Sequence, residues 1–443
     1  MARILRETLV QVRELSLAWG PFLLIGIAAL VLAFFLLKPT PPRQVTIAVG
    51  APDSAYASFG KRYAEELRRN GIQVTLRNTT GSCENLRLLH DAKEPVEFAF
   101  VLGGSCDRIR AADEDKGELP VVSLGTVSYE PVWVFYRTDE RQPVRELVDL
   151  RGRKVNVGSR GSGTPGITSK LLAANLVDRD ELTRSYLDDS QAVVALLAGS
   201  IDAMVLVSAP ESPIVQMLLQ TPGVGVLEFP QAEAYARRFP FITPVALPRG
   251  VADLSRDVPP RDVALIASTT SLVAREGAHP ALVQLFVQAA ARIHGGAGWI
   301  ARAGQFPSPA NSEFPLANEA ERFYKSGPPL LQRYLPFWLA NLIDRMWVAL
   351  FSIVAILIPL SRVVPPLYQF RVRSRVFRWY RQLRQIEEAS NRKERAAEDL
   401  VAELDRLEAR AARIIVPLSY ADELYALRQN INLVRTRLSR AAA

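Results

Sequence analysis

The 443-residue chain has only three histidines and two cysteines, the residue types that most often carry metal and redox chemistry. The histidines, His90, His279 and His294, lie too far apart in sequence to form a metal-binding motif. No serine lies in a nucleophile-elbow motif, and no cysteine–histidine pair is evident. The composition also excludes a disordered, collagen-like or disulfide-stapled chain. We therefore expect no enzymatic activity, no catalytic residues, no cofactor and no metal.

Net charge is absent from most of the chain. The formal charge is +8, of which residues 1–18 carry +1 and residues 361–443 carry +7. In residues 19–360 the formal charges cancel, with 34 basic and 34 acidic side chains. A pI near 9.6 ordinarily suggests nucleic acid. Because the positive charge is confined to the two ends, we expect no nucleic-acid partner.

The first apolar segment follows the N-terminal tail. Leu15–Leu37 has no charged residue in 23 positions and would span about 34 Å as a helix, enough for a bilayer core. We predict a cytoplasmic tail over residues 1–18, a transmembrane helix over 19–37 and a Pro-rich linker over 38–44. A cleaved signal peptide is the alternative, but Leu37-Lys38-Pro39 offers no small-residue cleavage site.

A second apolar segment lies near the C-terminus. Met346–Ser361 is uncharged, with Trp338 and Trp347 at one end and six arginines between Arg371 and Arg384 at the other. Aromatic residues on one flank and arginines on the other are typical of a membrane span with a cytoplasmic arginine side. We predict a transmembrane helix over 343–362, with a buried core helix as the alternative. Both termini would then be cytoplasmic, in a bacterial inner membrane.

Between these segments, short β-rich runs alternate with amphipathic helices, which is typical of an α/β fold with parallel strands. Two units of similar order predict two lobes, with Val121–Tyr136 crossing between them and Asp262–Ala267 returning. We assign residues 45–128 and 262–335 to lobe 1 and residues 129–261 to lobe 2. The predicted shorter strands are 44–49, 72–77, 96–102, 154–157, 184–187 and 203–207.

Three loops join the end of a predicted strand to the start of a helix: Gly50–Tyr56, Thr79–Asn85 and Gly158–Gly166. Free backbone N–H groups at such helix starts favour anions, and ligands bind at this edge of an open α/β sheet. Ser, Thr and Gly also cap helices everywhere, but three such loops together predict a binding cleft. Arg160 could offer its guanidinium to a carboxylate, or it could be a solvated surface residue.

The loop Gly161–Gly166 also matches the G-x-G-x-x-G pattern of dinucleotide sites, with Asp188 at a suitable distance. We disfavour a dinucleotide site because the predicted topology puts this loop outside the inner membrane, and Pro165 fits simple helix initiation. Cys83 and Cys106 are both expected near the same sheet edge. In an oxidising compartment they could form one disulfide, and two free thiols are the open alternative.

From about Val45 to Gly295 the sequence resembles the TAXI-type solute receptors of TRAP transporters. The resemblance rests on the stretches GAPDSAYASFGKRYAEEL, TTGSCENLRLL, LVDLRGRKVNVGSRGSGTPGITSKLL and LLAGSIDAMVLV. It implies a type II periplasmic binding-protein fold that binds small anionic solutes such as dicarboxylates or glutamate-like amino acids. The ligand-facing residues would be Tyr56, Thr80, Gly81, Ser82, Ser162, Gly163 and Thr164, with Asp53, Asn85 and Arg160 on the same loops.

The two predicted spans and the C-terminal tail depart from ordinary members of that family. In residues 367–443, apolar residues recur at steps of three and four from Trp379 to Ile414, and again after Pro417. This spacing predicts a cytoplasmic helical hairpin with coiled-coil packing, either self-paired or joined to a partner. A solvated charged helix that lies against anionic lipid is the alternative.

The sequence therefore predicts a membrane-anchored extracytoplasmic solute-binding protein that captures a small anionic solute between two lobes for TRAP-type uptake. Its partners would be that solute, membrane lipid and a separate permease, since two spans cannot form a permease. The alternative is a transmembrane sensor in which lobe closure acts on the cytoplasmic hairpin and a separate regulatory partner.

Overall fold

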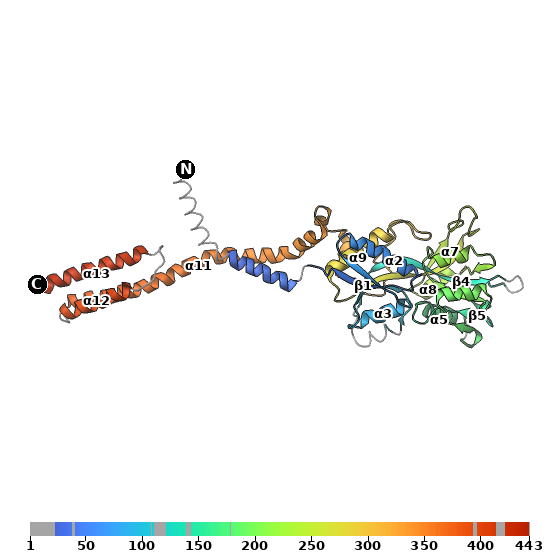
Figure 1. Ribbon diagram of the computed structural model, residues 1–443, viewed down its shortest axis with the longest axis horizontal. Helices are drawn as coiled ribbons and strands as arrows, with labels where there is room; N and C mark the ends of the chain where they lie inside the picture. The colour runs from blue at the N-terminus through green and yellow to red at the C-terminus, as the bar shows by residue number, and fades with distance from the viewer. Residues whose placement is uncertain are drawn as a thin grey trace. The chain divides into compact units, whose positions relative to one another are not determined.

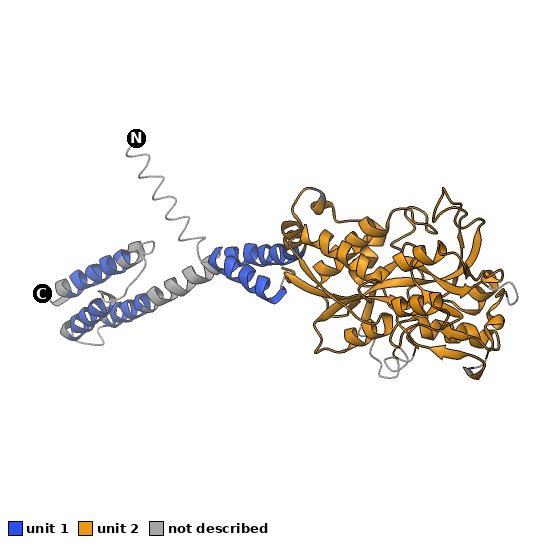
Figure 2. Cartoon of the chain, turned by 45° about the vertical axis from the view of Figure 1, so that its right-hand side comes forward, with its two compact units in different colours: residues 1–37, 345–443 blue, residues 38–344 orange. Residues whose placement is uncertain are grey.

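The computed structural model describes residues 23–37, 40–107, 109, 121–138, 143–177, 179–392, 397–412 and 421–442. The chain forms two units, residues 38–344 and residues 1–37 with 345–443 (Figure 2). We call the first the sheet domain and the second the helical unit.

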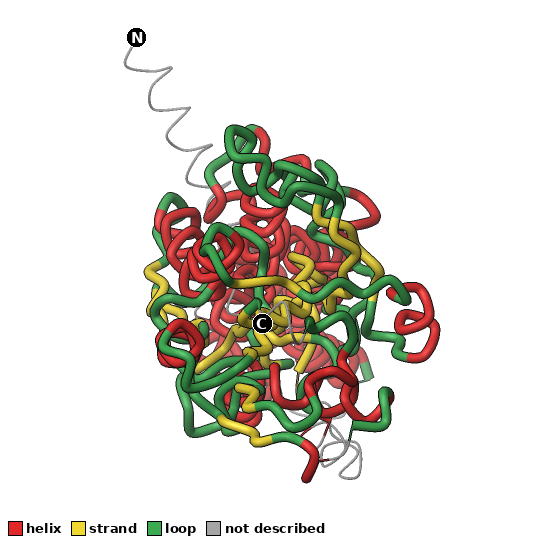
Figure 3. The backbone as a smooth tube through the Cα atoms, turned by 90° about the vertical axis from the view of Figure 1, so that its right-hand side faces the viewer, coloured by secondary structure: helices red, strands yellow, loops and turns green. Residues whose placement is uncertain are grey.

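Within the described residues, the sheet domain contains one mixed ten-stranded sheet with the main order β2-β1-β3-β10-β4-β7-β5-β6. Helices and loops surround its strands (Figure 3). The strands are β1 (Gln44–Ala48), β2 (Gln73–Arg77), β3 (Val96–Leu102), β4 (Val121–Arg137), β5 (Lys154–Asn156), β6 (Thr183–Ser185), β7 (Ala203–Val207), β8 (Val224–Val226), β9 (Thr243–Leu247) and β10 (Val263–Arg275). The α-helices are α2 (Ala55–Arg68), α3 (Ser82–His90), α5 (Thr164–Ala174), α6 (Asp189–Leu197), α7 (Pro213–Leu219), α8 (Ala232–Arg238), α9 (Pro280–His294) and α10 (Asn318–Ser326).

Two parallel sets of strands are joined by a long antiparallel pair. β1 pairs in parallel with β2 and β3, and β5 pairs in parallel with β6 and β7. β10 runs antiparallel to both β3 and β4, and β4 runs antiparallel to β7. The predicted α/β fold is thus confirmed. The return strand is longer than predicted, and β8 and β9 were not predicted.

Separate hydrophobic clusters form the core of each half. One half is packed around Phe98, Phe100 and Phe286, and the other around Trp133 and Phe135. We call these halves lobe 1 and lobe 2; the exact boundaries given above stay a prediction. Figure 1 shows α2, α3 and α9 around β1 in lobe 1, and α5, α7 and α8 in lobe 2. β4 and β10 are long and almost entirely buried because they run through the middle of the sheet, and Glu130 is the one charged residue in their interiors, since Arg137 and Arg275 end the two strands.

The helical unit begins with an apolar helix over Leu23–Leu37 and continues with most of α11 (Phe337–Asn391). Among the described residues, one helix is long and apolar enough to cross a membrane, namely Phe337–Arg362 within α11. α11 begins at Phe337, before the predicted span of residues 343–362, and runs through the charged pair Asp344-Arg345; the bounds of the span stay a prediction. Residues 19–22 of the predicted first span lie outside the described residues.

The apolar spacing from Trp379 to Ile414, which predicted the first part of a helical hairpin, extends over two helices in the structure. α11 ends at Asn391, and α12 (Ala397–Ala412) and α13 (Ala421–Ala442) follow as separate helices. All three contribute to one hydrophobic cluster, so the core has three helical contributors rather than the two of a hairpin. Pro417 lies outside the described residues. The buried side chains of this cluster are Leu383, Ile386, Leu400, Leu404, Leu407, Leu427, Ile431, Val434 and Leu438.

Candidate functional site

The two lobes touch through loops at the carboxyl ends of their parallel strands. The backbone N–H groups of Cys83 and Glu84, in the first turn of α3, donate to the carbonyl oxygen of Gly161 at 3.2 and 3.3 Å. Gly81 precedes α3 with a φ of +130°, and a Cβ added there would lie 3.1 Å from the Cα of Ser162. Glycine is therefore required at position 81 by both its conformation and its close neighbour. Two of the three predicted loops form this backbone contact.

Side chains make further contacts between the lobes. Ser190 of α6 donates its hydroxyl hydrogen to the Asp53 carboxylate in the loop after β1. Lys170 of α5 donates to the Gly104 carbonyl oxygen at 2.6 Å and forms an ion pair with Asp107 at 2.5 Å. The lobes therefore meet in a closed arrangement, in which Asp53 contacts the opposite lobe.

A cavity of about 600 Å³ lies between the lobes. Its lining includes Asp53, Lys61 and Arg62 from lobe 1 and Glu211 from lobe 2, with Tyr129 of β4 between them. This volume is within the range of small-molecule sites. The charged lining carries both signs. Of the predicted ligand-binding residues, Asp53 alone lines this cavity.

Several predicted residues are instead occupied by bonds within their own lobe. Asn85 is fully buried, donates to the Phe100 carbonyl oxygen at 2.9 Å and accepts from Thr79 at 2.6 Å, so it fastens α3 to β3. Thr80 donates through both its backbone and its hydroxyl to Glu84, each at 2.7 Å. These bonds give Asn85 and Thr80 structural roles in the loop.

The residues predicted in lobe 2 have similar local partners. The guanidinium of exposed Arg160 lies 4.4 Å from the ring centroid of Tyr186, a cation–π contact. Ser162 donates to the Ser159 carbonyl oxygen at 2.8 Å. Gly163 is the N-cap residue of α5, and Thr164 is buried in its first turn. None of these residues lines the 600 Å³ cavity.

Asp188, the acid that a dinucleotide site would require, caps a helix. Its side chain accepts from the Gln191 backbone N–H at 2.8 Å at the start of α6. Cys83 and Cys106 are joined by a disulfide, with their Cα atoms 5.5 Å apart. The bridge ties the first turn of α3, which contacts lobe 2, to the segment after β3.

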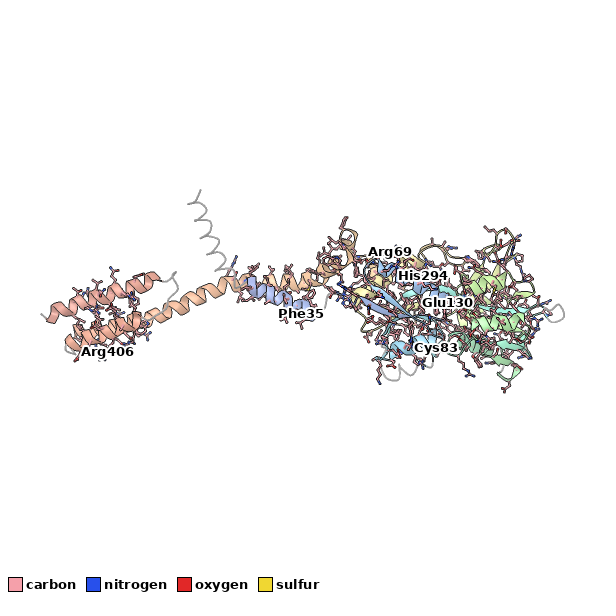
Figure 4. The ribbon with its side chains drawn as sticks, viewed as in Figure 1. Phe35, Arg69, Cys83, Glu130, His294 and Arg406 are labelled. Atoms are coloured by element: carbon pink, nitrogen blue, oxygen red, sulfur yellow. A yellow bond between two sulfur atoms is a disulfide. The ribbon has the colours of Figure 1, made fainter. Side chains whose placement is uncertain are left out.

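A buried polar network beside this contact was missed by the sequence reasoning. Glu130, on β4, is 2% exposed and accepts from Thr270 at 2.5 Å and from the Tyr56 hydroxyl at 3.3 Å. Tyr56 also lies 3.4 Å from the Ser82 hydroxyl, and Ser82 accepts from the Leu102 N–H. Figure 4 labels Glu130 and Cys83 in the sheet domain.

Burial without a cation raises the pKa of Glu130 to about 7, which the two donated hydrogen bonds only partly oppose. Burial, followed by the charge of Glu130, also raises the pKa of Tyr56. At the lobe contact, burial and the nearby charges of Asp53 and Asp188 raise the pKa of Asp189 to about 6. A signal for Glu130 was present in the sequence, because it is the one charged residue in Val121–Tyr136.

The fold and the cavity define a two-lobed α/β protein with a pocket between its lobes. The family model described as the NMT1-like family matches residues 54–325, so the chain belongs to this family. No protein of curated function matches the sequence.

The solved structures that match the chain include two named solute-binding proteins. The aliphatic sulphonate binding protein SsuA from Escherichia coli is 15% identical, with coverage of 75% of this chain and 94% of that one and a TM-score of 0.37. The amino acid transporter substrate-binding protein AbpA from Streptococcus pneumoniae, solved with L-arginine, is 13% identical, with coverage of 68% and 96% and a TM-score of 0.35.

Proposed function

We propose that the chain is a membrane-anchored extracytoplasmic solute-binding protein that captures a small solute between its two lobes. The main support is the cavity of about 600 Å³ at the lobe boundary, which has polar and charged side chains from both sides. A ligand that contacts both lobes stabilises their closed arrangement, since only that arrangement provides all of its contacts. Membership of the NMT1-like family fits this role.

The charges of the cavity favour one of the two predicted solute classes. Lys61 and Arg62 can pair with a carboxylate, whereas Asp53 and Glu211 can pair with an ammonium group. A glutamate-like amino acid carries both groups. A dicarboxylate would bring two negative charges beside two carboxylates and gain nothing from them. We therefore propose an amino acid with an acidic side chain as the ligand.

The anchor is proposed to consist of two spans, the N-terminal helix and the first part of α11. Most large apolar side chains of both helices are exposed, as lipid-facing residues would be; Leu36 is 73% and Phe351 69% exposed. Gly26 packs against α11, since a Cβ added there would lie 2.9 Å from Leu357 Cδ1. Small residues at such a crossing are typical of packed membrane helices. With the arginine-rich segment on the inner side, both termini would be cytoplasmic in a bacterial inner membrane.

The resemblance to TAXI receptors suggests delivery of the solute to a TRAP-type permease. A sensor role is the second candidate because α11 runs without interruption from the sheet domain into the three-helix cluster. The two roles differ in their partner. Affinity purification of the full chain from membranes, with and without solute, would recover a permease in the first case and a cytoplasmic regulator in the second.

Ligand binding can be tested by thermal shift on the full chain in detergent, with acidic amino acids, dicarboxylates and basic amino acids as separate ligands. A ligand at 100 times its Kd stabilises the folded state by about 2.7 kcal/mol. We expect a rise in midpoint with an acidic amino acid. Arg62→Ala should weaken binding roughly tenfold or more, about 1.4 kcal/mol. Arg68→Ala, on the same helix but outside the cavity, is the control. The absence of a shift with every solute would contradict the proposal.

A further inference from the structure

The segment that connects the sheet domain to α11 exposes an unusual number of apolar side chains. We call residues 328–338 the connector; it includes the short helix η3 (Leu330–Arg333) and the first residues of α11. Leu330 is 71% exposed, Tyr334 84% and Trp338 62%. Arg333 is the one charged residue between Pro328 and Ile343. Contiguous exposed apolar residues with so little charge mark an interaction surface.

The connector is attached to lobe 1. The Gln288 side chain of α9 donates to Gln332 at 2.6 Å, and Phe337 packs against the hydrophobic cluster around Phe98. Ala340, one turn further along α11, is 2% exposed. The exposed side chains therefore project from a backbone segment that the lobe 1 core positions.

We propose that the connector lies in the outer interface of the bilayer and seats lobe 1 on the membrane. The same helix that presents Trp338 continues directly as the proposed span, so the connector must reach the lipid head-group level. Trp and Tyr prefer that level because one part of the ring is apolar and another is polar. Leucine side chains would enter the adjacent acyl region. This inference rests on the proposed membrane anchor.

The chain path makes this attachment specific to lobe 1. The linker from the first proposed span enters β1, and the exit to the second passes through α10 and the connector. Both strand β1 and helix α10 belong to lobe 1, whereas lobe 2 has no direct connection to a span. Lobe 1 is consequently the membrane-fixed half, and lobe 2 is the half that moves when the cleft opens or closes.

The test uses the full chain in phosphatidylcholine–phosphatidylglycerol nanodiscs. The cysteines of the described residues are bridged, so one added cysteine gives one site for a nitroxide spin label without reduction. Tyr334→Cys probes the connector. Leu254→Cys, 88% exposed on lobe 2, is the aqueous control, and Ile356→Cys, 65% exposed in the proposed span, is the lipid control. Collision rates with oxygen and with a water-soluble nickel chelate report the depth of each label.

We expect the label at position 334 to be at least threefold less accessible to the nickel chelate than the label at 254, and less deep than the label at 356. If the label at position 334 is in water and the label at position 356 is in lipid, lobe 1 does not contact the membrane through the connector, and the anchor proposal remains intact. If the label at position 334 is shielded from both oxygen and the nickel chelate, the proposed membrane contact is also refuted, because a protein surface would then cover the connector. If the label at position 356 is in water, the proposed membrane anchor itself is refuted.

Discussion

Glu130 should make the sheet domain less stable as the pH rises. The carboxyl is buried on β4, without a cation, between the hydroxyl groups of Tyr56 and Thr270. Its pKa is about 7 in the folded protein against an ordinary value of 4.5. The folded state therefore holds this proton more tightly than the unfolded state does. Stability is fully present below pH 4.5 and is lost progressively until the pH passes about 7.

The magnitude follows from the two pKa values. The interval from 4.5 to about 7, at 1.36 kcal/mol per pH unit, corresponds to about 3 kcal/mol. Glu130→Gln keeps the size of the side chain and an oxygen that can accept from Thr270, but it cannot ionise. We expect this variant to be more stable than the natural chain by up to about 3 kcal/mol at pH 8, and close to it at pH 4.5.

Urea unfolding of both chains at several pH values, followed by tryptophan fluorescence, to which buried Trp133 contributes, measures this difference. Other groups titrate in both chains, so the difference between the variant and the natural chain isolates Glu130. Glu65→Gln, the same change at an exposed position on α2, is the matched control. A Glu130→Gln advantage that is constant between pH 4.5 and 8 would refute the reasoning, because it would show that ionisation does not cause it.

Three other changes test separate parts of the structure. Gly81→Ala should weaken solute binding in a titration, because the added Cβ lies against Ser162 at a φ of +130°; Gly71→Ala, at a φ of +77° with open space around it, should leave binding unchanged. Burial lowers the pKa of His294 to about 3, so the unfolded state binds a proton at this residue more readily than the folded state does. The domain should therefore lose stability progressively as the pH falls from 6.5 to about 3. His294→Phe should reduce that acid sensitivity in unfolding experiments. Leu404→Ala, in the centre of the three-helix cluster, should cost about 2–5 kcal/mol, whereas Leu433→Ala, at a side chain 54% exposed, should cost under about 1 kcal/mol by chemical denaturation.

The central strands were predictable because they are buried on both faces and therefore consist mostly of apolar, β-branched and small polar residues, with Glu130 as the one charged residue inside them. β8 and β9 were not, because each pairs with one strand of the sheet path and their burial is only partial. The bounds of the helices in the C-terminal tail were not predictable for a different reason. Heptad spacing continues across a helix break, and it cannot reveal that α11 ends at Asn391 and that a separate helix, α12, begins at Ala397.

The candidate site likewise has a part that the sequence could predict and a part that it could not. The loops were found because glycine, serine and threonine at a strand-to-helix junction are a local signal. The Glu130 network is not local: Tyr56 reaches partners 26, 74 and 214 residues away. The cavity also needs Glu211, which carries no motif. Such contacts depend on the complete topology. The sequence pattern pointed to loops at the sheet edge where the lobes meet, and several of the residues it selected form bonds within those loops.

The contact between Gly161 and the first turn of α3 uses only main-chain groups. We call this pair of backbone hydrogen bonds the latch. It forms without side-chain hydrogen bonds, as long as glycine stays at position 81 and the disulfide at Cys83 holds the turn in place. Substitutions at cavity residues other than Asp53, which itself bonds to Ser190 of lobe 2, would then change which solute is selected and leave this main-chain contact in place. Selectivity and closure would be separable during evolution, so relatives with the same latch could bind chemically different solutes.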